Sequence, residues 1–129
     1  MATSWEVLGN RLSDVITYEE DERQRFSREN INVAASQTLG IGSLVVSTTG
    51  IGGTFVEYDG SQTLASADVG IVVNALTTDS TGGAQTVMVC RHARYLPANL
   101  VWKTGVTTLQ KTAFTNALLT KGVAPSTGV

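Results

Sequence analysis

The charged residues of this 129-residue chain are unevenly distributed, and this separates an N-terminal segment from the remainder. Residues 1–30 carry seven acidic and four basic side chains, so 11 of the 20 charges lie in the first quarter of the sequence. The run EEDERQR at 19–25 cannot bury enough apolar surface to offset the entropy of ordering. We therefore divide the chain into an arm over residues 1–29 and one domain over residues 30–129.

The arm also contains apolar residues, which a purely solvated segment does not need. One reading is a helix with an apolar face, and another is a short strand over the sequence DVITY at 14–18. A dense charge run is ordinarily a solvated surface, whereas apolar side chains beside it are typical of anchors for a partner. The residues that would line the helix face are Trp5, Leu8, Leu12, Val15 and Ile16.

The body has the pattern of short strands separated by glycine-rich turns. We expect strands at 30–35, 43–47, 54–58, 69–76 and 84–91. The segment 69–76 is almost continuously apolar, which predicts burial on both faces. The loop at 77–83 should join it to 84–91 as an antiparallel hairpin, and Asp59-Gly60 would suit a second hairpin turn.

One helix is expected near the C-terminus. Thr107 and Gln110 have the spacing of a capping box, and Gly122 suits the position after the last turn. Pro125 then prevents the helix from continuing, and we expect residues 123–129 to be a flexible tail. The predicted fold class is α+β: a small β-rich domain with one C-terminal helix and an extended N-terminal arm.

Composition excludes several classes of function. The net charge of −2 argues against a strongly basic nucleic-acid binder. Cys90 is the single cysteine and His92 the single histidine, so neither an internal disulfide nor a zinc site can be built from them. No apolar stretch approaches the ~20 residues that span a bilayer, and the first residues lack the pattern of a secretory signal. We expect no cofactor, no metal, and no nucleic-acid or membrane partner.

The candidates for catalysis are weak. Cys90 and His92 would share one face of a strand, but nothing nearby supplies an oxyanion site. The glycine-rich stretch 40–53 lacks the lysine of a phosphate-binding loop. Glu57 and Asp59 are more simply explained as a solvated strand end than as a hydrolytic pair. The sequence therefore predicts no catalytic residue and no enzyme.

Two surface features point to binding. Arg91, Arg94 and Tyr95 would form a small basic patch able to contact an acidic protein. Tyr95 and Trp102 are the one pair of aromatic residues that could serve a carbohydrate-binding β-module on a virion or cell surface. Such a carbohydrate-binding module is one candidate function for this chain.

From residue 26 to residue 115 the chain resembles the head decoration proteins of lambda-like tailed phages. The resemblance lies in the order and spacing of four segments, while the tail after Leu119 and the longer, more charged arm depart from it. The four segments are FSRENINVAASQTL at 26–39, GTFVEYDG at 53–60, ADVGIVVNALTTDSTGGAQTVMVCRHARY at 67–95, and LVW at 100–102 with the helix that follows.

The resemblance implies a structural protein of the virion, made in the host cytoplasm. Such proteins form homotrimers on the three-fold and quasi-three-fold positions of the expanded head and stabilise it against internal DNA pressure. Their arm contacts the major capsid protein by adding a strand to its sheet. The capsid-binding residues expected on this basis are Trp5, Leu8, Leu12, Asp14, Val15, Ile16, Thr17, Tyr18, Arg23, Arg25, Phe26 and Arg28.

Overall fold

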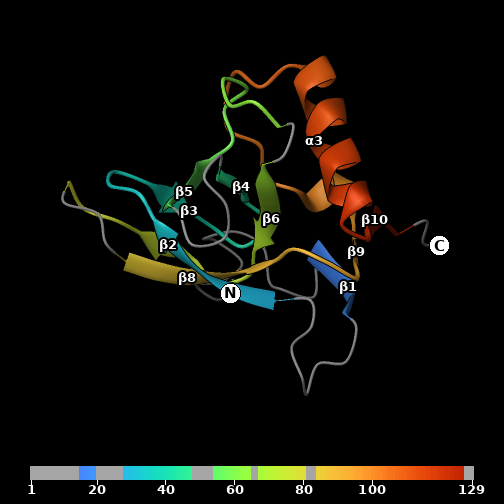
Figure 1. Cartoon of the computed structure of the whole chain (residues 1–129), viewed down its shortest axis with the longest axis horizontal. Coiled ribbons are helices and arrows are strands. Elements are labelled where there is room, and N and C mark those ends of the chain that lie inside the picture. The colour runs from blue at the N-terminus through green and yellow to red at the C-terminus, as the bar shows by residue number, and fades with distance from the viewer. Residues whose placement is uncertain (1–14, 20–27, 48–53, 65–66, 81–83, 127–129) are drawn as a thin grey trace, which may run out of the picture.

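A closed five-stranded barrel forms the centre of the structure, a computed structural model that describes residues 15–19, 28–47, 54–64, 67–80 and 84–126 (Figure 1). The barrel order is β2-β5-β4-β6-β8. Only the β2–β5 contact is parallel, and the β2–β8 pairing, from Arg28↔Val89 to Val33↔Ala84, closes the barrel. The strands are β2 (Arg28–Val33), β4 (Leu44–Ser47), β5 (Thr54–Glu57), β6 (Asp68–Val72) and β8 (Ala84–Val89).

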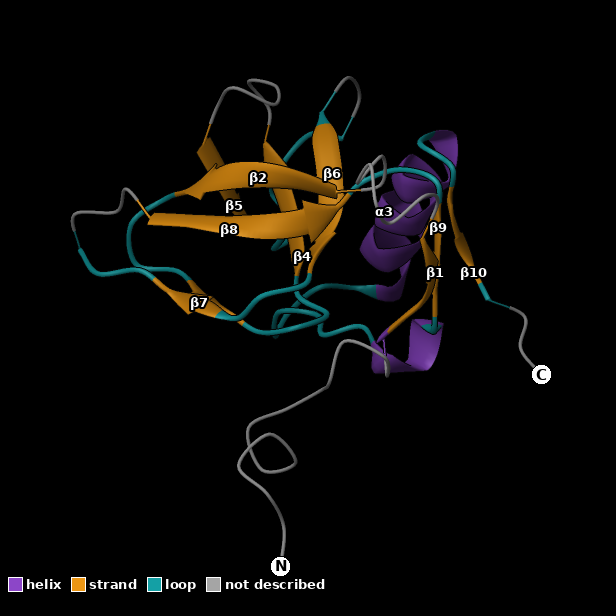
Figure 2. Ribbon diagram, turned by 90° about the horizontal axis from the view of Figure 1, so that it is seen from below, coloured by secondary structure: helices purple, strands orange, loops and turns teal. Residues whose placement is uncertain are grey.

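A second layer covers one side of the barrel. It consists of helix α3 (Thr108–Thr120) and a three-stranded sheet in the order β1-β9-β10 (Figure 2). Its strands are β1 (Ile16–Glu19), β9 (Ala93–Tyr95) and β10 (Val123–Pro125). At the far end of the barrel from α3, β3 (Thr38–Leu39) pairs with β7 (Leu76–Thr77). A short 3-10 helix, η1 (Pro97–Asn99), follows β9 in the chain.

Alternate residues of β4 and β6 belong to two different cores. Val45 and Val72 join a cluster to which all five barrel strands contribute, together with Phe55, Met88 and Ile31. Their neighbours Leu44, Val46, Val69 and Ile71 join a larger cluster with the helix and the three-stranded sheet. Because successive side chains of a strand point to opposite faces, both faces of β6 are buried, which confirms the predicted two-sided burial for 69–72. The strand ends at Val72, earlier than predicted, and Asn74 and Ala75 are exposed.

Helix α3 begins as the sequence predicts. Thr107 is the N-cap, its Oγ1 accepts a hydrogen bond from Gln110 N at 3.2 Å, and Gln110 Oε1 accepts one from Thr107 N at 2.9 Å. Gln110 Nε2 also donates to the carbonyl oxygen of Gly60 at 3.4 Å, which ties the helix to the turn after β5. Phe114 and Leu118 are fully buried and face the larger core.

The fold class is confirmed for the described residues: the domain is β-rich with a helix near the C-terminus. Two further local expectations are wrong. Asp59-Gly60 makes no hairpin, because β5 pairs with β4 and β2 instead of with the residues after the turn. Residues 123–125 are a strand and not part of a flexible tail, because Gly122 (φ 82°) redirects the chain and Val123 is fully buried.

The close approach of Gly70 to β8 yields the first prediction. A Cβ at Gly70 would collide with the side chain of Met88 and lie 2.9 Å from the carbonyl oxygen of Val89. We expect Gly70→Ala to lower the free energy of unfolding by ~1–3 kcal/mol, as overpacking of a core does. Gly40→Ala is the matched control, since a Cβ there meets nothing within 4 Å. Urea unfolding of both variants measures the difference, and equal stability would contradict the described strand contact.

Candidate functional site

The three-stranded sheet brings the two ends of the described chain together. β9 is the central strand: Tyr95 is opposite Ile16 of β1 on one side and opposite Pro125 of β10 on the other. Leu96 N donates to Val15 O at 2.8 Å, and Ser126 N donates to Tyr95 O at 2.7 Å. Among the described residues neither β1 nor β10 has a second partner strand, so each leaves one backbone edge open. An open edge can accept an added strand.

β1 is held in place by the core as well as by its pairing. The side chain of Val15 is fully buried and that of Ile16 is 8% exposed, and both belong to the larger core. These two residues were expected to contact a partner as part of an arm. Their side chains are instead occupied within the domain, which leaves the outer backbone edge of β1 as the part of the strand that is open.

The other expected binding residues divide into two groups. Thr17 and Tyr18 lie in β1, where the register shifts between Ile16 and Tyr18, and Tyr18 is opposite Arg94. Arg28 begins β2 and lines a small polar depression with Glu29, Asn30 and Val87. The remaining predicted residues lie outside the described ranges: Trp5, Leu8, Leu12, Asp14, Arg23, Arg25 and Phe26.

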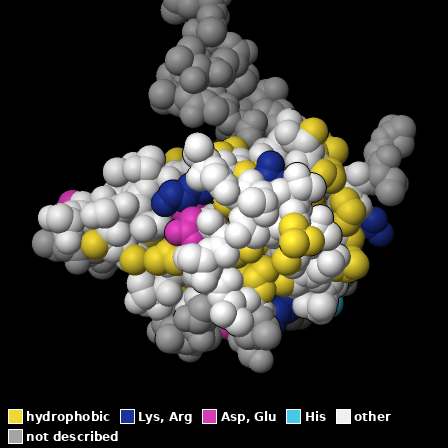
Figure 3. Space-filling view, turned by 90° about the horizontal axis from the view of Figure 1, so that it is seen from above, with side chains coloured by type: hydrophobic (Ala, Val, Ile, Leu, Met, Phe, Trp, Pro, Cys, Tyr) yellow, Lys and Arg dark blue, Asp and Glu magenta, His cyan; other side chains and the backbone are white. Residues whose placement is uncertain are grey.

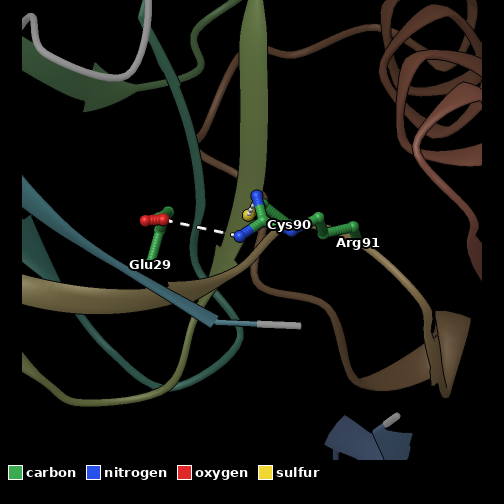
Figure 4. A network of polar contacts seen from close by, with 3 residues as sticks. All are labelled: Glu29, Cys90 and Arg91. Atoms are coloured by element: carbon green, nitrogen blue, oxygen red, sulfur yellow. Dashed lines mark hydrogen bonds and ion pairs between the residues drawn. The ribbon is translucent and has the colours of Figure 1, made fainter. Parts of the chain in front are cut away.

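The basic patch predicted around His92 is divided by the fold. Arg91 Nη2 lies 3.5 Å from Glu29 Oε2, and its Nη1 lies 3.4 Å from Cys90 Sγ (Figure 4). Arg94 is exposed on β9, whereas Tyr95 is 1% exposed and faces the core. The three side chains therefore do not form one surface. Arg91 contacts Glu29 near the start of β2, just beyond the end of β8. Of Arg94 and Tyr95, both on β9, Arg94 is the exposed one.

The cysteine and the histidine are not arranged for catalysis. β8 ends at Val89, and His92 adopts a positive φ of 51°, so Cys90 and His92 do not share a strand face as expected. Cys90 is 5% exposed, and burial raises the pKa of its thiol from 9.0 to about 11 although Arg91 opposes the shift. A thiol with this pKa is protonated at neutral pH and is a poor nucleophile.

Glu57, the last residue of β5, and Asp59, in the turn that follows, have separate environments. Burial raises the pKa of Glu57 from its ordinary value, with the charge of Lys103 acting in the opposite direction. Hydrogen bonds from the hydroxyl and the backbone N–H of Ser61 lower the pKa of Asp59. Asp59 thus stabilises the turn after β5, and this explains its conformation without a hydrolytic role.

The aromatic pair expected for carbohydrate binding is not formed. Tyr95 is buried, and Trp102 lies edge-on to Phe114 with ring centroids 5.9 Å apart. Lys111 Nζ lies 5.8 Å from the centre of the Trp102 ring. Within the described residues, Tyr95 and Trp102 therefore present no common face to a sugar. The carbohydrate-binding hypothesis loses the aromatic pair on which it depended.

No group of three or more His, Cys, Asp or Glu side chains is placed to hold a metal ion in the described residues. No helix in the same part of the chain has the length and apolar character to cross a membrane.

Among the described residues, the unpaired backbone edges are those on the outer sides of β1 and β10. The family model described as bacteriophage lambda head decoration protein D matches residues 7–123. The chain belongs to this family, which is a structural and not an enzyme family. Membership implies association with a phage capsid and a place on the virion. No curated protein and no solved structure gives a significant match.

Sequence reasoning missed the sheet that forms this site. β9 and β10 have three residues each, too few for a recognisable alternation, and their pairing joins distant parts of the chain. The buried alternation of Ala93 and Tyr95 around Arg94 was the one available signal for β9. β1 was foreseen as one of two possibilities for DVITY, but its partner strand was not.

The raised pKa of Cys90 predicts its reactivity. In the folded protein the thiol should react only slowly with a thiol reagent at pH 8, and the rate should rise with pH toward about 11. Unfolding in denaturant should restore ordinary reactivity, because the burial that raises the pKa is lost. The same shift makes folding less favourable above pH 9, since the unfolded thiol ionises first. Equal labelling rates in native and denatured protein at pH 8 would contradict this burial.

Proposed function

We propose that this protein forms homotrimers on the outer surface of the expanded phage head, at its three-fold and quasi-three-fold positions. In this proposal the trimer binds the major capsid protein, joins neighbouring capsomers and stabilises the shell against the pressure of packaged DNA. The protein is made in the host cytoplasm and needs neither nucleic acid nor a membrane as a partner. The observation that carries the proposal is the open outer edge of β1 in a member of the head decoration family.

The outer edge of β1 supports attachment by strand addition. An exposed strand edge offers unpaired N–H and C=O groups that a strand of the capsid protein can satisfy. Because Val15 and Ile16 are buried, β1 presents this edge without first having to fold. The backbone edge would set the register of the added strand, and the apolar anchors before β1 would provide much of the affinity.

The capsid-binding arm of the proposal lies on both sides of β1. Before β1, Trp5, Leu8 and Leu12 would be apolar anchors, with Asp14 next to the strand. After β1, Phe26 would be an apolar contact for the capsid protein. Arg23, Arg25 and Arg28 would meet acidic groups of the capsid protein, where charge complementarity favours correct docking.

Trimerisation would convert weak single contacts into stable attachment. Once one copy of a trimer is bound, the other two face their sites at a high effective concentration. Overall affinity can then exceed that of one arm by ~100-fold or more without a new contact. This matches the need of a shell protein to hold many capsomers together while each monomer remains small.

Deletion of residues 1–13 tests the proposal. This truncation removes the apolar anchors but keeps Val15 and Ile16, whose loss would damage the core. We expect the full chain to cosediment with expanded capsids of its own phage and the truncated chain to remain largely in the supernatant. Both should have the same melting temperature.

The control is a second variant with only the aromatic anchor changed, Trp5→Ala, which should reduce binding to a lesser extent. If the truncated chain cosediments as well as the full chain, residues 1–13 are not the attachment. If neither chain binds expanded capsids, the proposed decoration of the head is wrong for this protein.

A further inference from the structure

Pro125 is a residue that neither the helix nor the core explains. The sequence suggested that it stops the helix, but α3 ends at Thr120, and Gly122 with its φ of 82° already redirects the chain. Gly122 N donates to Leu119 O at 3.0 Å, which closes the last turn before the proline is reached. Pro125 is also exposed, so packing in the core does not account for it. Its place in β10 gives a different explanation.

The backbone of β10 faces β9 at every second residue. Ala93 N donates to Gly122 O at 3.2 Å, and Ser126 N donates to Tyr95 O at 2.7 Å. Residues 122 and 126 therefore both face the central strand, one at each end of β10. Because the hydrogen bonds of a parallel ladder are evenly spaced, Ala124, midway between them, faces β9 as well.

Val123 and Pro125 direct their backbone groups to the opposite side of β10, on the outside of the sheet (Figure 2). No other strand of the described residues pairs there. Val123 offers an N–H and a C=O group, whereas Pro125 offers only a C=O group, because its ring closes on the nitrogen. A strand added on this side would have one carbonyl group facing a ring methylene instead of a donor. Leaving such a group unpaired in an interface is costly.

Charge does not protect this edge. Lysine side chains commonly keep other strands away from a sheet edge, but β10 consists of Val123–Pro125 and carries no charge. Lys121, which precedes it, lies 3.5 Å from Asp68 Oδ1. On the face shown in Figure 3, charged side chains are few and are scattered among apolar and uncharged ones. Within β10, the proline is therefore the residue able to protect the edge.

The outer edge of β1 has no such obstacle. All four residues of β1 (Ile16–Glu19) carry a backbone N–H group, and among the described residues the outer side of this strand is also unpaired. The register shift between Ile16 and Tyr18 adds twist without removing a donor. Proline in sheets is confined largely to edge strands, where it hinders the addition of a further strand. The two outer edges of this sheet are therefore unequal.

We propose that Pro125 closes the β10 edge to strand addition and so directs the capsid strand to β1. The inference deepens the proposed function, since it rests on strand addition and names the residue that limits it to one edge. Without this restriction, the β1 edge of one copy could pair with the β10 edge of the next. Such a head-to-tail contact extends indefinitely unless its rotation closes a ring.

The variant Pro125→Thr tests the inference. It restores an N–H group on the open side of β10 and introduces a residue type that favours strands. One restored hydrogen bond is enough to strengthen an association about tenfold. We expect the variant to form assemblies that lengthen with concentration, whereas the unchanged protein should stop at one limiting size. Sedimentation velocity over a concentration series measures both.

Ala124→Thr is the matched control, because it places the same residue type in the same strand but adds no donor to the open side. It should sediment like the unchanged protein, and all three proteins should melt within a few degrees of one another. The inference is overturned if Pro125→Thr keeps the unchanged size at every concentration. Equal lengthening of the control, or unlimited growth of the unchanged protein, would also overturn it.

Hydrogen exchange of the unchanged protein gives a second test that needs no variant. On saturating expanded capsids, the amide of Val123 should exchange as in the free protein, while β1 gains protection. Protection gained at Val123 would show that β10 accepts a strand and would overturn the inference.

Cosedimentation with expanded capsids separates the inference from the proposed function. If Pro125→Thr lengthens as expected but neither it nor the unchanged protein binds capsids, Pro125 closes the edge and the proposed function fails. If the unchanged protein binds capsids but Pro125→Thr does not lengthen, the proposed function stands and the inference is wrong.

Discussion

The pairing of β9 with β1 on one side and β10 on the other is the interaction on which the arrangement of this protein depends. It attaches the N-terminal strand to a sheet that also receives the chain after α3. Since Val15, Tyr95 and Val123 are all buried in one core, the sheet and the helix stabilise each other. Among the described residues, the outer edge of β1 is thereby held in a fixed position.

The barrel supports this sheet through strands whose two faces both contribute to a hydrophobic core. β4 and β6 place alternate side chains in the barrel cluster and in the larger core, so the two layers share the same backbone. The cost is tight packing, as the contact of Gly70 with β8 illustrates.

Local signals in the sequence predicted the elements that depend on local interactions. The capping box at Thr107 and Gln110 and the apolar run of β6 could both be predicted, since each is a property of neighbouring residues. The closure of β2 on β8 and the short strands β9 and β10 were not, because they depend on pairing between distant segments. For the same reason Val15 and Ile16 read as part of an arm, although their apolar side chains belong to the core.

Hydrogen exchange of the protein free and bound to expanded capsids would test the central claim most directly, namely that the capsid adds a strand to β1. In the free protein, the amides of β1 that face β9 should be protected and those on its outer edge should exchange rapidly. Binding should add protection to residues 1–19 and leave the barrel strands unchanged. Protection gained only in the barrel or its loops, with β1 unaltered, would contradict the account.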